Sequence, residues 1–153
     1  MELFNLDLQS LTTTLIKLIA AFLVTLPVAW DRETQGRSMG LRTFPLVAMA
    51  SCAFILVAGD VIGIDNDNAQ ARLIQGLMTG IGFIGGGAIL KGGGTVRGTA
   101  TAASIWGTGA IGAAVAYGRL EIAIIVSLFT FLLLRGLRPV KGHIKEMNDD
   151  ENL

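Results

Sequence analysis

The sequence predicts an all-α membrane protein, folded as a compact bundle of five transmembrane helices. Of its 153 residues, 52% are hydrophobic and 16% are charged. Soluble domains typically carry about 25% charged residues. Here the apolar residues are gathered into runs close to the roughly 18 to 20 residues that cross a bilayer. This composition excludes a soluble enzyme, a nucleic-acid-binding protein and a disordered regulator. The 20 glycines predict closely packed helices.

Five apolar runs account for the five predicted spans. The first contains Lys17, and the second has Asp60 near its end. The fifth is short, so the Arg135 side chain must extend toward the membrane interface. The predicted spans are Leu11–Trp30, Pro45–Ile64, Leu73–Leu90, Thr101–Tyr117 and Leu120–Leu137.

Loop charges predict the orientation. Basic residues gather between spans one and two, between spans three and four, and after span five. The opposite loops hold Arg72 and Arg119 together with several acidic residues. By the positive-inside rule, the N-terminus lies outside and the C-terminus is cytoplasmic. We expect a membrane domain over residues 1–140, a short charged cytoplasmic tail over 141–153, and no cleavable targeting segment.

Glycines in spans three and four recur at a spacing that places pairs on one helix face. Small residues four apart let helix backbones approach closely in a membrane. We therefore expect these glycines to pack helices together. The alternative is that Gly85–Gly87 loosen the helix and expose carbonyl groups to a cavity. The predicted packing glycines are Gly76, Gly80, Gly82, Gly85, Gly86, Gly87 and Gly112.

Charged residues inside the spans are the first site candidates, because each costs about 2.5 to 3.5 kcal/mol or more at a helix centre. Counted from the outer ends of their spans, the depths of Lys17 and Asp60 differ by only about 3 Å. We expect the two side chains to face each other or to share a wet vestibule. The alternative is that Lys17 extends outward and Asp60 is interfacial.

A second polar cluster is predicted at the cytoplasmic side. Unpaired N–H groups at the start of span four, capped by Thr99 or Thr101, offer a place for a carboxylate or a phosphate. In the structural interpretation, the carboxylate of Asp31 or Glu33 in the same chain occupies that place. In the functional one, the cluster is a regulated gate or a dock for a partner or a lipid headgroup. Its members are Asp31, Arg32, Glu33, Arg42, Lys91, Arg97 and Thr101.

The acidic loop on the outer side suggests a weak magnesium hypothesis. Asp60, Asp65 and Asp67 offer the hard oxygen ligands that Mg²⁺ prefers. The spacing fails the calcium-loop pattern, and a solvated acidic loop is the favoured interpretation. No nucleophile–base pair is visible, so we expect no catalysis and no resident cofactor, with Mg²⁺ as the one candidate ligand.

Three blocks of the sequence carry a family resemblance. The first combines Asp31-Arg32-Glu33 with Gly40-Leu41-Arg42-Thr43, the second is the run Gly80–Ile89, and the third joins Val96-Arg97-Gly98, Thr101-Ala102-Ala103 and Ile105-Trp106. In this order they resemble the MgtC/SapB family of membrane proteins, over roughly Leu11–Leu137. Two departures are Phe44, where many members have His, and Thr99-Ala100, where Leu-Thr is more usual.

The resemblance implies a non-enzymatic, multi-pass protein of the bacterial inner membrane that supports magnesium homeostasis when magnesium is scarce. The resemblance covers the family's transmembrane domain, and we expect the short charged tail after Leu137 to be too small for the C-terminal regulatory domain that some members carry. The expected partners are the lipid bilayer, another inner-membrane protein complex and a second copy of the chain. The alternative function is a small oligomeric cation transporter or channel, with Lys17 and Asp60 on its path.

Overall fold

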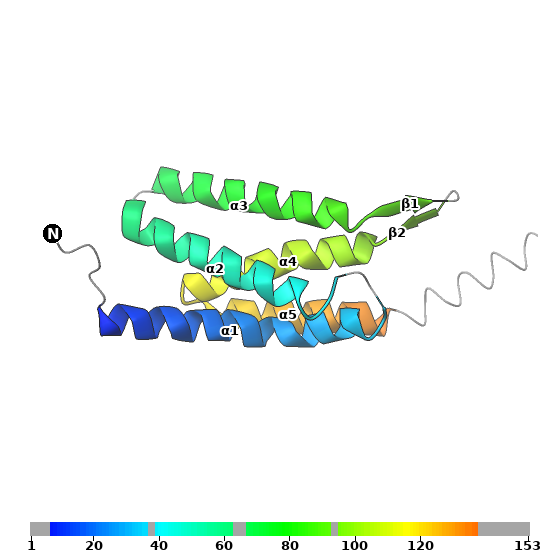
Figure 1. The fold of residues 1–153 in the computed structure, drawn as a ribbon, viewed down its shortest axis with the longest axis horizontal. Helices are drawn as coiled ribbons and strands as arrows, with labels where there is room; N and C mark the ends of the chain where they lie inside the picture. Colours follow the sequence, from blue (N-terminus) through cyan, green and yellow to red (C-terminus); the bar gives the residue numbers. More distant parts are fainter. Residues whose placement is uncertain (1–6, 37–38, 63–66, 93–94, 138–153) are drawn as a thin grey trace, which may run out of the picture.

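The computed structural model describes residues 7–36, 39–62, 67–92 and 95–137. Each predicted apolar run coincides with a helix, and a short hairpin precedes the fourth helix (Figure 1). The elements are α1 (Leu8–Glu33), α2 (Thr43–Ile62), α3 (Asp67–Gly87), β1 (Leu90–Gly92), β2 (Thr95–Arg97), α4 (Thr99–Ala116) and α5 (Leu120–Gly136).

The boundaries of the third helix differ most from the prediction. The helix starts at Asp67 rather than Leu73, and it ends at Gly87 rather than Leu90. Asp67 lies in the first turn, where a negative charge is favourable against the helix dipole. The hydropathy pattern missed this start because the first turns of α3 are polar.

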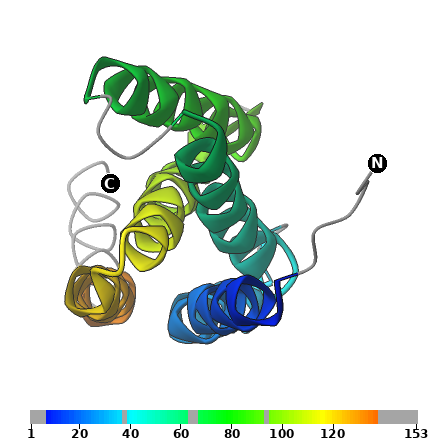
Figure 2. The same ribbon diagram turned by 90° about the vertical axis from the view of Figure 1, so that its left-hand side faces the viewer.

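The helices lie in three layers. Seen from one end, α2 and α4 lie in the middle, α3 lies on one side of them, and α1 and α5 lie on the other (Figure 2). Consecutive helices alternate in direction. The end of the bundle that carries the β1–β2 hairpin, here called the hairpin end, is where α1, α3 and α5 finish and α2 and α4 begin (Figure 1).

Helix α4 is the most buried element and α3 is among the least buried. Ten of the 18 residues of α4 are buried, whereas α3 buries only Ile81 and Gly85 among its 21 residues. One core cluster surrounds Ile111 and Cys52, and a second surrounds Phe44 and Ile105. Phe44 is the largest fully buried side chain among the described residues.

Gly112 sets the separation of α2 and α4. A Cβ added at Gly112 would lie 2.1 Å from the Ala48 carbonyl oxygen and 2.9 Å from the Ser51 Cβ. Since the nearest atom belongs to the α2 backbone, a side chain at this position would push the helices apart. Helix α4 also receives Ile81 of α3, whose Cδ1 would lie 2.1 Å from a Cβ at Gly109.

The glycines of α3 divide into two groups. Gly85 lies against α4, where an added Cβ would be 3.1 Å from the Ala102 carbonyl oxygen. A Cβ at any of the others would meet nothing within 4 Å in this chain. The expected helix contact within the bundle is therefore made by Gly85 and Gly112, while five glycines face open space: Gly76, Gly80, Gly82, Gly86 and Gly87.

The hairpin was not expected from the sequence. Leu90 pairs with Arg97 and Lys91 with Val96 in an antiparallel register, and the connecting residues 93–94 lie outside the described part of the chain. Gly98 follows with φ +90°, and a Cβ there would lie 1.9 Å from the Ala88 carbonyl oxygen. Only glycine permits both the left-handed backbone and this close approach.

Two helices satisfy a test of length and hydropathy for crossing a membrane. They are Leu8–Glu33 and Thr43–Val61. These two segments coincide with the first two predicted spans.

Replacing Gly112 with alanine should destabilise the fold by about 1–3 kcal/mol, because the added methyl group overpacks the contact between two backbones. Gly86→Ala is the matched control. It adds the same methyl group to open space, and the higher helix propensity of alanine should stabilise the helix by about 0.5–1 kcal/mol. Thermal unfolding in detergent measures both variants. Equal transition temperatures would contradict the packing role of Gly112.

Candidate functional site

An ion pair is buried at the last turn of α1. Asp31 and Arg32 are each only 3% exposed. The Arg32 Nη2 and Nε groups donate to the Asp31 Oδ2 atom over 2.5 and 3.2 Å. The Gln35 side-chain amide donates to the same Oδ2 over 2.6 Å and to the Asp31 carbonyl over 2.7 Å. Such burial is tolerated because each charge has a partner.

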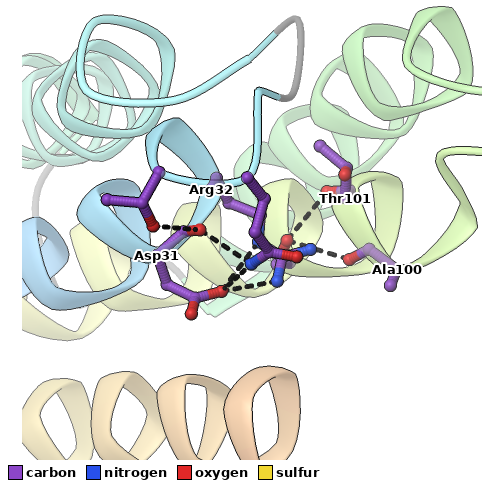
Figure 3. Close-up of polar contacts among 7 residues, drawn as sticks. Asp31, Arg32, Ala100 and Thr101 are labelled. Carbon is purple, nitrogen blue, oxygen red and sulfur yellow. Dashed lines mark hydrogen bonds and ion pairs between the residues drawn. The ribbon is translucent and has the colours of Figure 1, made fainter. Parts of the chain in front are cut away.

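The pair lies against the start of α4. Figure 3 shows Asp31 and Arg32 beside Ala100 and Thr101, so residues far apart in the sequence meet here. Arg32 belongs to the last turn of α1, where a positive charge is favourable at the negative end of the helix dipole. The Thr101 side chain is buried in the same region. The structure thus brings the last turn of α1 beside the first turn of α4.

A polar pocket of about 320 Å³ adjoins the ion pair. Two arginines line it, the buried Arg32 and the exposed Arg97 from β2. The first turn of α4 forms another wall, and amides in a first turn have no acceptor within their own helix. The pocket can therefore accommodate a small anionic group. Its lining consists of Arg32, Val96, Arg97, Gly98, Thr99, Ala100 and Thr101.

The predicted cap of α4 is wrong. The residue that precedes the helix is Gly98, which makes no side-chain capping bond. Its carbonyl instead accepts the Ala102 N–H over 2.8 Å. The capping position itself has no room for a side chain, because Gly98 lies close to the Ala88 carbonyl oxygen. Thr99 and Thr101 lie within the helix and do not cap it.

Glu33 contacts the connection to α2 rather than α4. Its Oε2 atom accepts the Leu41 N–H over 3.0 Å, and a Cβ at Gly40 would lie 2.2 Å from that oxygen. Arg42 and Lys91 are exposed at the same end of the bundle and do not line the pocket. Of the seven predicted cluster members, the pocket and its ion pair contain four: Asp31, Arg32, Arg97 and Thr101.

Lys17 has a different partner from the one expected. Its Nζ atom donates to the Ala116 carbonyl over 2.7 Å, at the C-terminal end of α4. Unpaired carbonyls and the helix dipole make this a favourable place for a cation. Asp60 is exposed, and the ion pairs within the described residues join Arg32 to Asp31 and Arg119 to Glu121. The predicted direct contact between Lys17 and Asp60 is therefore not formed; a shared vestibule stays a prediction.

The acidic residues near the opposite end do not gather into a metal site in the described parts of the chain. Asp60 and Asp67 are exposed, and Asp65 lies outside the described residues. Across the described ranges, no three His, Cys, Asp or Glu side chains are close enough together to hold a metal ion.

Sequence reasoning missed Gln35 and two contacts between helices. Gln35 follows Asp31 by four residues, a spacing at which Gln and Asp side chains can bond along one helix face. The Tyr117 hydroxyl donates to the Gln70 Oε1 over 2.5 Å, and the Ser127 hydroxyl donates to the Val24 carbonyl over 2.5 Å. No local pattern pointed to these last two contacts, because each depends on how distant helices pack.

Two of the helices have the length and apolar composition found in helical membrane proteins. Residues 18–143 match the sequence model of the MgtC family, and the chain belongs to this family. It is 38% identical over 136 residues to Protein SrpB of Synechococcus elongatus, covering 82% of this chain and 75% of that protein. No solved structure matches it.

Two further relatives are longer than the part they share with this chain. One, named "Putative magnesium transporter YhiD" in Escherichia coli (strain K12), is 36% identical over 88% of this chain and 65% of its own length. Protein MgtC of Brucella abortus (strain 2308) is 34% identical over 86% of this chain and 54% of its own length. The chain thus spans between about half and two thirds of these two proteins.

Breaking the buried ion pair from one side should be costly. Arg32→Met leaves the Asp31 carboxylate buried without its cation, and we expect a loss of about 3–5 kcal/mol in the free energy of unfolding. The double variant Asp31→Leu with Arg32→Met should be more stable than Arg32→Met alone, since no buried charge remains. The exposed pair is the control, and Arg119→Gln should cost less than about 1 kcal/mol. Chemical denaturation of the wild type and these three variants tests this, and a double variant no more stable than Arg32→Met would contradict the coupling.

Lys17 and Asp60 should act independently on stability. Lys17→Met removes the bond to the Ala116 carbonyl and should destabilise the protein by about 1–3 kcal/mol. Asp60→Asn should change stability by less than about 0.5 kcal/mol, as for other exposed sites. In a double-mutant cycle we expect additivity within about 0.5 kcal/mol. A larger coupling energy would indicate that the Lys17 and Asp60 side chains contact each other directly.

Proposed function

We propose that this chain is a non-enzymatic, multi-pass protein of the bacterial inner membrane that supports magnesium homeostasis by acting on other membrane proteins. Family membership supports the link to magnesium, as do the names of the relatives YhiD and MgtC. The exposed, glycine-rich surface of α3 supports the mode of action, because it leaves a contact surface for a partner outside this chain.

In this proposal all five helices cross the membrane, with the hairpin end in the cytoplasm. The charges at the two ends of the bundle support the orientation. Basic residues predominate at the hairpin end, whereas acidic residues predominate at the opposite end. By the positive-inside rule, the hairpin end is the cytoplasmic one. The described basic residues there are Arg32, Arg42, Lys91, Arg97 and Arg135.

One face of α3 fits contact with a helix of another protein. At 3.6 residues per turn, four exposed residues lie within a sector of about 60°. We call this sector the Gly82 face; it comprises Gln75, Thr79, Gly82 and Gly86. Neither glycine has an atom within 4 Å of an added Cβ, and the Thr79 hydroxyl donates within its own helix. Small residues four apart allow close helix association where lipid supplies no hydrophobic drive.

The packing of the bundle favours action on a partner over transport. The contact at Gly112 brings the α2 and α4 backbones together at the centre. The ammonium group of Lys17 is bound to the Ala116 carbonyl rather than to the carboxylate of Asp60. The alternative, a small oligomeric cation transporter, therefore requires a path outside this central contact.

Gly82→Leu combined with Gly86→Leu should abolish growth support at low magnesium. The new side chains extend into open space in this chain, so folding should be retained while partner contact is blocked. The measurement is growth of a strain that depends on this protein for low-magnesium growth, with protein amount and thermal unfolding followed in parallel. The control, Gly107→Ala, alters a glycine whose Cβ would make an ordinary 3.8 Å contact with Thr130. Full growth of the double leucine variant would contradict the proposed contact.

Sealed vesicles separate the two functions. Purified wild-type protein should give no magnesium or other cation uptake above that of protein-free vesicles. Uptake that is present in the wild type and lost in Asp60→Asn would instead establish the transporter.

A further inference from the structure

A groove of about 750 Å³ runs between α2 and α3. It extends along α3 from Arg72 to Ile84, which corresponds to about 18 Å of helix. On α2 it extends from Leu46 to Phe54. The other residues that line it are Val47, Ala50, Ser51, Leu73, Gly76, Leu77, Gly80 and Ile81.

Two glycines give the groove its depth. Gly76 and Gly80 form part of its α3 wall, and a Cβ at either position would meet nothing within 4 Å. These glycines therefore do not serve close packing inside this chain. Their effect is to leave an elongated apolar space open along the side of the bundle. The exposed Leu46 and Phe54 side chains flank it on α2.

The lining carries one charged side chain. Arg72 lies at the end of the groove opposite the hairpin, five residues into α3, or about 7.5 Å from the start of the helix. The rest of the lining is apolar except for the Ser51 hydroxyl, which donates to the Val47 carbonyl over 2.7 Å within α2. A matching ligand therefore has a long apolar body and an anionic group at one end.

We propose that the groove binds an anionic phospholipid, with an acyl chain along Gly76 and Gly80 and the phosphate beside Arg72. The charge pattern of the lining favours this occupant, because an elongated apolar wall with one cation at its end matches an acyl chain that carries a phosphate. The arginine fork matches phosphate oxygens in geometry and in charge.

The groove and the Gly82 face lie on different sides of α3. Gly76 and Gly80 line the groove, whereas Gly82 and Gly86 do not. Helix α3 buries only Ile81 and Gly85 against the bundle. A lipid in the groove would add to this small contact and hold the helix in place. The inference requires that the chain lie in a membrane, but not that it act on a partner protein. The two proposals can therefore fail separately.

Native mass spectrometry of the purified chain in detergent tests the inference. Added phosphatidylglycerol should be retained about tenfold more strongly than phosphatidylcholine of the same chain length, as a charge-assisted contact predicts. Arg72→Gln should remove this preference. Arg119→Gln, a change at an exposed arginine near the same end that does not line the groove, should leave it intact.

A second variant tests the site of the acyl chain. Gly80→Leu fills the groove without a clash and should lower retention of both lipids, whereas Gly86→Leu, its match on the other side of α3, should not. Thermal unfolding confirms that each variant is folded. Equal retention of the two lipids by the wild type, or an undiminished preference in Arg72→Gln, would overturn the proposal. The proposal would also be overturned if the wild type formed dimers and Gly80→Leu dissociated them, because a second copy of the chain would then occupy the groove.

Discussion

Where Gly112 of α4 meets Ala48 of α2, two helix backbones lie too close together for a Cβ to fit between them. Small residues at this contact let the backbones of the two helices pack directly against each other. The other helices are arranged around the pair: α1 and α5 on one side and α3 on the other (Figure 2). The position of α4 in turn brings Ala116 to Lys17 at one end and Thr101 to Arg32 at the other. Both polar sites therefore depend on the position of α4, which this contact helps to fix.

The two polar sites handle buried charge in different ways. Lys17 is only partly buried and uses a carbonyl at a helix end, which requires no counter-charge. Arg32 is almost fully buried and needs the Asp31 carboxylate, to which Gln35 adds a further bond. A buried pair of this kind resists changes in its surroundings, because separating the charges exposes each to a low dielectric. The pocket beside it thus has one rigid wall at Arg32 and one exposed charge at Arg97.

Helix α3, like α5, leaves most of its surface uncovered by the chain itself. Its anchors to α4 are Ile81, which fits over Gly109, and Gly85, which lies against Ala102. The remaining small residues face outward on two sides. A lipid in the groove and a partner helix on the Gly82 face would act on the same weakly held element. Binding at one could then alter the other through the position of α3, without any change in the α2–α4 contact.

The sequence by itself determined the helical class, the approximate place of each helix and the family, because apolar runs and short ordered motifs such as Asp31-Arg32-Glu33 and Val96-Arg97-Gly98 are local features. It also identified Asp31, Arg32 and Thr101 as neighbours, since alternating helices bring their ends together. The sequence did not predict the β1–β2 hairpin, the partner of Lys17 or the division of the α3 glycines into two groups. Only the tertiary structure decided these features. A glycine spacing indicates that another helix can approach closely. The rotation of the helix against its neighbours decides which of its faces is covered and which remains open.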